Sequence, residues 1–153
     1  MIRRLSIAVA TVMLLVGLAP AAAGAVSTTA TPAPVSACVV RIARLAFRPH
    51  TAMVGTTATL KLAARNCTKL PQSATVQFTA SWVGPSAGLP NGCPVIDPLA
   101  EPASFAPHGK FTAQVGYLVP AGCAATALDA TVQITGASGT PLATGTARLR
   151  IRQ

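Results

Sequence analysis

From residue 38 onward, apolar and polar side chains alternate along the chain with a period of two, which is typical of half-buried β-strands. The clearest stretches are residues 58–64, 76–82, 111–117, 128–134 and 147–151. Residues 39–47 and a weaker stretch at 103–106 bring the prediction to about seven strands, separated by turns rich in Pro and Gly. We therefore expect an all-β, immunoglobulin-like antiparallel β-sandwich, with a small barrel as the competing architecture.

The N-terminal segment reads differently, because a cationic start and an apolar run of residues 5–18 precede the small residues Ala23 and Ala25. This is the pattern of a secretory signal peptide, so residues 1–25 are expected to be removed after Ala25 or Ala23. Residues 26–37 form a Thr/Pro/Ala-rich linker, and residues 38–153 form one domain. We expect a secreted, extracellular protein that can associate with the cell envelope, with no stable membrane insertion after cleavage. The alanine-rich composition suggests a bacterial source.

Export makes the four cysteines candidates for disulfide bonds, because oxidising compartments favour them. Four cysteines allow three pairings. The similar intervals from Cys38 to Cys67 and from Cys93 to Cys123 suit the joining of one strand's start to its antiparallel neighbour's end, so these two bridges are predicted. No CxxC pair or histidine pair accompanies them, and we expect no metal and no cofactor.

Residues able to support catalysis are scarce. The chain has two histidines, His50 and His108, and each lies in a predicted turn. The three acids, Asp97, Glu101 and Asp129, are too few and too scattered to suggest paired carboxylates, and no G-x-S-x-G motif occurs. The sequence therefore favours a protein that is not an enzyme, with a small enzyme as the less favoured alternative.

The formal net charge of +9 favours anionic partners. Arg148, Arg150 and Arg152 lie two residues apart on the last predicted strand, so all three should project from one face. If the first strand lies beside the last, Arg41, Arg44 or Arg48 comes close to them. We interpret this group as a candidate site for an anionic envelope polymer, or else as charge that protects an edge strand. Nucleic acid is not expected, because no aromatic residues interleave with the arginines.

Two stretches resemble secreted bacterial immunoglobulin-like modules, including cell-adhesion-related domains. The first contains the sequence Phe-Arg-Pro at residues 47–49, continues through residues 54–60 and ends in Asn66; the second covers residues 105–112 and 117–120. The resemblance implies the sandwich fold and carries no single activity with it.

A second, shorter similarity concerns residues 84–102, a long segment with five prolines. Its part from Cys93 to Pro98 is similar to the reactive-site segment of subtilisin-inhibitor-like proteins. That resemblance implies that Val95 would be the specificity residue and Ile96 its downstream neighbour, in a loop made rigid by its disulfide. The residues in between, 94–97, are also a candidate for a short edge strand.

Taken together, these features predict a secreted, non-enzymatic binding or structural module of the cell envelope or extracellular space. Its partner would be an anionic envelope polymer or another protein, bound through the arginines or the long loop. The alternative is a secreted protease inhibitor that acts through residues 93–98.

Overall fold

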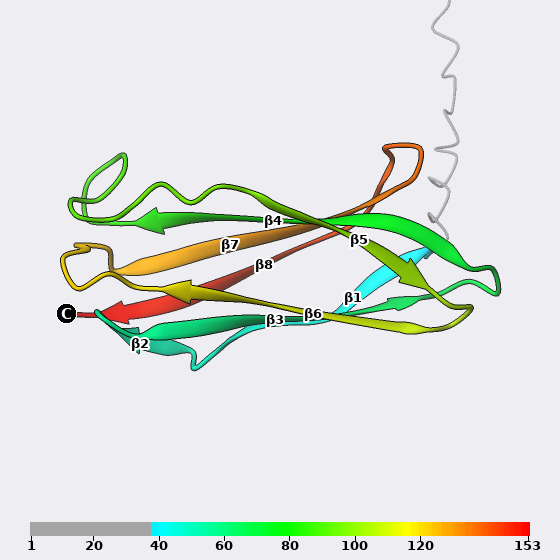
Figure 1. Ribbon diagram of the computed structural model, residues 1–153, viewed down its shortest axis with the longest axis horizontal. Coiled ribbons are helices and arrows are strands. Elements are labelled where there is room, and N and C mark those ends of the chain that lie inside the picture. Colours follow the sequence, from blue (N-terminus) through cyan, green and yellow to red (C-terminus); the bar gives the residue numbers. More distant parts are fainter. Residues whose placement is uncertain (1–37) are drawn as a thin grey trace, which may run out of the picture. The chain divides into compact units, whose positions relative to one another are not determined.

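Two β-sheets packed face to face make up the fold of residues 38–153, the part of the chain that the computed structural model describes (Figure 1). The strands are β1 (Val40–Arg48), β2 (Thr51–Met53), β3 (Thr57–Asn66), β4 (Gln72–Val83), β5 (Leu99–Phe105), β6 (Lys110–Leu118), β7 (Ala127–Gly136) and β8 (Pro141–Arg152). One sheet has the order β1-β3-β6, and the other has the order β2-β8-β7-β4-β5. The predicted all-β immunoglobulin-like sandwich is confirmed.

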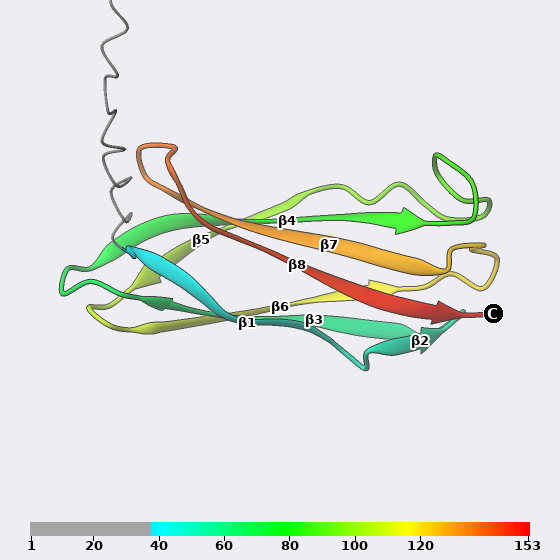
Figure 2. The same ribbon diagram turned by 180° about the vertical axis from the view of Figure 1, so that it is seen from behind.

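The chain changes sheets between β1 and β2, at Arg48 and His50. β1 pairs with β3 in the three-stranded sheet, whereas β2 pairs in parallel with the end of β8 in the five-stranded sheet. All other strand pairs are antiparallel. Both views show β1 leading into β2 along one side of the sandwich (Figures 1 and 2).

The core follows from the period-two pattern, because alternate residues of each strand point between the sheets. On β3, Ala58, Leu60, Leu62 and Ala64 are buried while the residues between them face outward. The largest fully buried apolar side chains are Phe47, Phe78, Phe105, Leu60, Leu128, Ile134 and Leu149. The outward residues do not pack in the core, and their chemistry therefore decides what each face can bind.

A β-bulge interrupts the alternation on β1. Ile42 pairs with Ala64 and Arg44 pairs with Ala63, so Ala43 is the extra residue. A bulge shifts the facing of every later side chain by one position. For this reason Arg44 and Arg48 face outward together with Arg41, although the spacing of the three residues does not fit a regular strand.

Three details differ from the expectation. There are eight strands, because the three-residue β2 carried no alternating pattern that could be read, and β8 begins at Pro141, earlier than predicted. Residues 94–97 do not form a strand; that prediction was wrong, since these residues pair with no neighbour and β5 begins only at Leu99.

Both predicted disulfides are confirmed. Cys38–Cys67 joins the start of β1 to the end of β3, as expected for antiparallel neighbours, with a Cα–Cα distance of 5.7 Å. Cys93–Cys123 has a different basis, because it connects the β4–β5 loop to the β6–β7 loop, at 4.4 Å. The two loops lie at the same end of the sandwich (Figure 1). The similar sequence intervals therefore reflect two different geometries.

The predicted signal peptide (residues 1–25) and linker (residues 26–37) lie outside the described residues. Within residues 38–153, the structure contains no helix of the length and apolar character needed to cross a membrane.

Candidate functional site

The outer face of the three-stranded sheet gathers basic side chains from all of its strands. Arg41, Arg44 and Arg48 come from β1, Lys61 and Arg65 from β3, and Lys110 from β6. All six are exposed, and we call this set the basic face. Sequence reasoning considered the three β1 arginines only as neighbours of the last strand and did not single out Lys61, Arg65 or Lys110.

Three of these cations stand side by side at one end of the basic face. Arg65 is paired with Arg41 on one neighbouring strand and with Lys110 on the other. Like charges directly opposite each other on adjacent strands destabilise a sheet. An anion bound beside the row Arg41–Arg65–Lys110 would therefore reduce the repulsion among these three cations.

No acidic side chain neutralises the basic face. The whole sequence contains three acids. Asp97 lies in the β4–β5 loop, while Glu101 and Asp129 lie on β5 and β7 of the other sheet. Glu101 is half-buried on the edge strand β5, and its Oε1 has no hydrogen-bond partner among residues 38–153.

An open depression of about 750 Å³ lies in the middle of the basic face. Arg44, Arg48 and Lys61 border it. Its floor is low because small residues stand opposite the long ones: Ala63 pairs with Arg44, and Ala46 pairs with Lys61. Thr112 and Gln114 of β6 complete the lining with neutral hydrogen-bonding groups. The depression can thus admit an extended anionic chain, with cations on its β1 and β3 sides and neutral groups on its β6 side.

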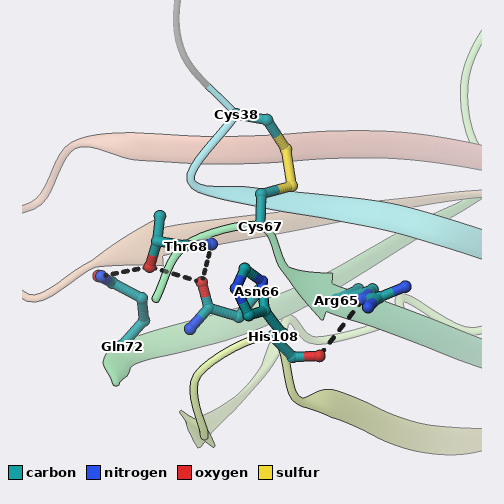
Figure 3. Close-up of a disulfide and its surroundings, with 7 residues drawn as sticks. All are labelled: Cys38, Arg65, Asn66, Cys67, Thr68, Gln72 and His108. Carbon is teal, nitrogen blue, oxygen red and sulfur yellow. Dashed lines mark hydrogen bonds between the residues drawn. A yellow bond between two sulfur atoms is a disulfide. The ribbon is translucent and has the colours of Figure 1, made fainter. Parts of the chain in front are cut away.

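The position of Arg65 is fixed by the turn between β5 and β6. Its Nε donates a hydrogen bond to the carbonyl oxygen of His108 at 3.3 Å (Figure 3). His108 has a positive φ of 52°, which turns the chain sharply before Lys110. Four of the five guanidinium N–H donors of Arg65 remain available for a ligand, because within residues 38–153 the His108 carbonyl is its one hydrogen-bond partner.

Asn66, next to Arg65, fastens the same turn from inside. Its side chain is fully buried, and Nδ2 donates to the carbonyl oxygens of Leu70 at 2.7 Å and Ala106 at 3.0 Å. Its Oδ1 accepts the backbone N–H of Thr68 at 2.9 Å (Figure 3). Asn66 formally begins an Asn-Cys-Thr glycosylation motif, but its amide nitrogen is buried and engaged, so the residue has a structural role.

The predicted arginine site on the last strand has a different surrounding from the one expected. Arg148, Arg150 and Arg152 do project from one face of β8, alternating with the buried Leu149 and Ile151. However, Asp129 on β7 lies directly opposite Arg148 and accepts two hydrogen bonds from its guanidinium, both at 2.5 Å. No acid lies close to these arginines in the sequence, but Asp129 reaches Arg148 because cross-strand neighbours need not be close in sequence.

The first-strand arginines also do not join that group. Arg41 and Arg44 belong to the outer face of the other sheet, since β1 pairs with β3 and not with β8. β1 faces β8 across the core, and the backbone hydrogen bond with β8 comes only after Arg48, where the Arg150 N–H donates to the His50 carbonyl oxygen at 3.1 Å. The structure therefore divides the predicted set of arginines between two faces.

The ion pair with Arg148 lowers the pKa of Asp129, mainly through the hydrogen bonds. Any stability it contributes is complete above the ordinary carboxyl pKa and is lost as the pH falls through the lowered one. Both side chains are substantially exposed, at 61% and 39%, so solvent screens the pair. We expect Asp129→Asn to leave the denaturant midpoint at pH 7 nearly unchanged; a large drop, measured by urea unfolding, would contradict this.

The other predicted binding residues, Val95 and Ile96, lie in an ordered loop. Val95 is 76% exposed, whereas Ile96 is partly buried against the core. The carbonyl oxygen of Pro94 accepts a hydrogen bond from Trp82 Nε1 at 2.8 Å. Gly92, with a φ of +70°, lies so close to Gly122 that a Cβ would meet its carbonyl oxygen. Together with the disulfide, these contacts hold the loop in place, with the apolar side chain of Val95 exposed to solvent.

Within the described part of the chain, no three His, Cys, Asp or Glu residues come close enough together to hold a metal ion. His50 interacts with Arg48, whose Nη1 lies 2.9 Å from His50 Nε2, and His108 belongs to the turn described above.

Comparison with known proteins supports the fold. No family model matches the chain, and no curated protein matches its sequence. Among solved structures, it is similar to the Pseudomonas fluorescens alkylpurine DNA glycosylase AlkC bound to DNA (TM-score 0.57, 15% identity, 76% of this chain and 31% of that one). It also resembles a Paenibacillus cycloisomaltooligosaccharide glucanotransferase (0.52, 13%, 74% and 14%) and the Bacillus subtilis sporulation control protein Spo0M (0.52, 9%, 75% and 50%). This chain spans half or less of each, and at such identities the likeness concerns the fold alone.

Proposed function

We propose that this protein is a secreted, non-enzymatic immunoglobulin-like module that binds an anionic polymer of the cell envelope or extracellular space. The basic face is the binding surface. One observation carries the proposal: Arg41, Arg65 and Lys110 stand directly opposite one another on three adjacent strands, with no acid on their sheet.

The charge distribution supports binding over mere solubility. Surfaces that serve solubility alone usually carry charges of both signs interspersed, whereas a large field of one sign is typical of surfaces that steer a charged ligand. An edge-protection role does not account for the central strand, because β3 is paired on both sides and still contributes Lys61 and Arg65.

The test compares two triple variants that remove the same charge. In the first, Arg41→Gln, Arg65→Gln and Lys110→Gln neutralise the cation row. In the second, Arg148→Gln, Arg150→Gln and Arg152→Gln neutralise the arginines of β8. We expect the first variant to lose most of its retention on immobilised anionic polymer at low salt, by about 10-fold or more, because three phosphate or carboxylate contacts disappear. The second should stay close to wild type.

Unfolding midpoints of both variants provide the control, since exposed substitutions contribute little to stability. If the β8 variant loses binding and the row variant keeps it, the binding surface is the other sheet. Equal losses of binding in the two variants would mean that only net charge matters, and would contradict binding through the basic face.

A second candidate function rests on the Val95 loop. A protease inhibitor offers a rigid, extended segment with an exposed specificity residue, and the hydrogen bond from Trp82 to Pro94 holds the chain in that way. Inhibition would require a stoichiometric complex with a serine protease that accepts valine, and Val95→Asp would abolish it. Turnover of the protein as an ordinary substrate, cleaved after Val95, would contradict this role.

A further inference from the structure

The cations of the basic face form a regular track along the strands. Four successive outward rungs cross the three strands, and each contains at least one cation. The rungs are Arg41–Arg65–Lys110, then Arg44–Ala63–Thr112, then Ala46–Lys61–Gln114, and finally Arg48–Thr59–Gly116. The bulge at Ala43 is what brings Arg44 onto the second rung.

The spacing of this track is set by the backbone. Outward residues on one strand are two positions apart, or about 6.7 Å. The four rungs therefore offer positive charge at intervals of about 6.7 Å over a length of about 20 Å. A ligand whose negative charges repeat at the same interval, in an extended conformation, matches every rung without large movements of the Arg and Lys side chains.

From this match we infer that the ligand is a linear phosphodiester polymer of a three-carbon polyol, lying along the strands. The inference rests on the proposed function and specifies its ligand. Two extended residues contain six backbone bonds and span about 6.6 to 7.2 Å. A glycerol phosphate repeat also has six backbone bonds from one phosphorus to the next, so its charges fall in step with the rungs.

The side chains of the track suit phosphodiesters. Four of the six cations are arginines, whose planar guanidinium matches the two non-bridging oxygens of a phosphodiester. Thr59, Thr112 and Gln114 face outward between them and can hydrogen-bond to polyol hydroxyls. Carboxylated polysaccharides carry their charges on rigid rings, whose spacing is not set by six freely rotating backbone bonds, so we expect them to match the four rungs less well.

Single-stranded nucleic acid also has six backbone bonds between phosphates, but its bases need surfaces to stack on. On β1, β3 and β6 the aromatic residues Phe47, Phe111 and Tyr117 all face inward. The basic face offers alanine, glycine, threonine and glutamine between its cations, which favours a ligand without bases.

The experiment measures binding of the mature domain to fluorescent poly(glycerol phosphate), polygalacturonate and oligo(dT) of equal charge number, over a range of salt concentrations. We expect poly(glycerol phosphate) to bind about 10-fold or more tightly than polygalacturonate, with a salt slope near −3 for four contacts at about 0.7 each. Affinity should rise steeply with chain length up to four repeats and weakly beyond.

The variant Lys61→Gln removes the one cation of the third rung, and Arg150→Gln on the other sheet is its matched control. Lys61→Gln should reduce the slope by about 0.7 and weaken the dependence on chain length, while Arg150→Gln should do neither. Equal affinity for polygalacturonate would overturn the phosphodiester inference but leave anion binding intact. Tighter binding of oligo(dT) would identify a nucleic-acid ligand instead. No binding of any of the three polymers at low salt would overturn the proposed function itself.

Discussion

Replacing Trp82 with alanine is expected to destabilise the domain by about 3–5 kcal/mol, which is the usual cost of deleting a large buried aromatic side chain. Trp82 is 7% exposed at the end of β4, and its indole N–H also holds the carbonyl oxygen of Pro94. The variant should therefore lose both core packing and the anchor of the Val95 loop. Urea unfolding followed by circular dichroism measures the loss.

Trp82→Phe separates these two contributions. Phenylalanine keeps most of the packing but cannot donate the hydrogen bond, so its cost should be smaller and should be accompanied by faster proteolysis within residues 84–98. An unchanged midpoint for Trp82→Ala would place the side chain on the surface, against the structure.

Asn66→Ala is expected to cost about 1–3 kcal/mol, because it removes the hydrogen bonds of a fully buried side chain and leaves the backbone N–H of Thr68 without its partner. The carbonyl oxygens of Leu70 and Ala106 each lose one donor but keep another, the hydroxyl of Thr68 and the backbone N–H of Gly109 respectively. The substitution removes little apolar area, so the loss would come from hydrogen bonding alone.

The neighbouring substitution Arg65→Gln serves as the control, since Arg65 is exposed and should leave the unfolding midpoint within error. Arg65→Gln should instead weaken polymer binding. If Asn66→Ala proves as stable as wild type, water replaces the lost hydrogen bonds and Asn66 does not stabilise the turn between β5 and β6.

The strands could be predicted from the sequence wherever one face is buried and the other is solvated. Residues 58–64 on β3 and 76–82 on β4 show that pattern clearly, and their burial agrees with it. β2 is too short to show a period. The prediction of a strand at residues 94–97 was wrong because the apolar pair Val95–Ile96 is held by the disulfide and the indole of Trp82, and not by a neighbouring strand.

The basic face could not be predicted because it depends on strand order and on one bulge. Lys61 and Arg65 were visible as outward positions, but nothing local says that β3 lies between β1 and β6. A regular strand would have turned Arg44 inward, away from Arg41, and the bulge at Ala43 reverses this. Conversely, the even spacing of Arg148, Arg150 and Arg152 was easy to see, while the cross-strand partner Asp129 was not.

The central claim, that the β1-β3-β6 sheet binds an anionic polymer through its outer face, is tested most directly by mapping the contact residue by residue. A ¹H–¹⁵N correlation spectrum of the labelled mature domain would be recorded during titration with poly(glycerol phosphate) at low salt. The account predicts shifts concentrated at Arg41, Arg44, Lys61, Arg65 and Lys110 and their strand neighbours, reversed by added salt. Shifts concentrated on β8 around Arg148–Arg152, or in the loop around Val95, would contradict it.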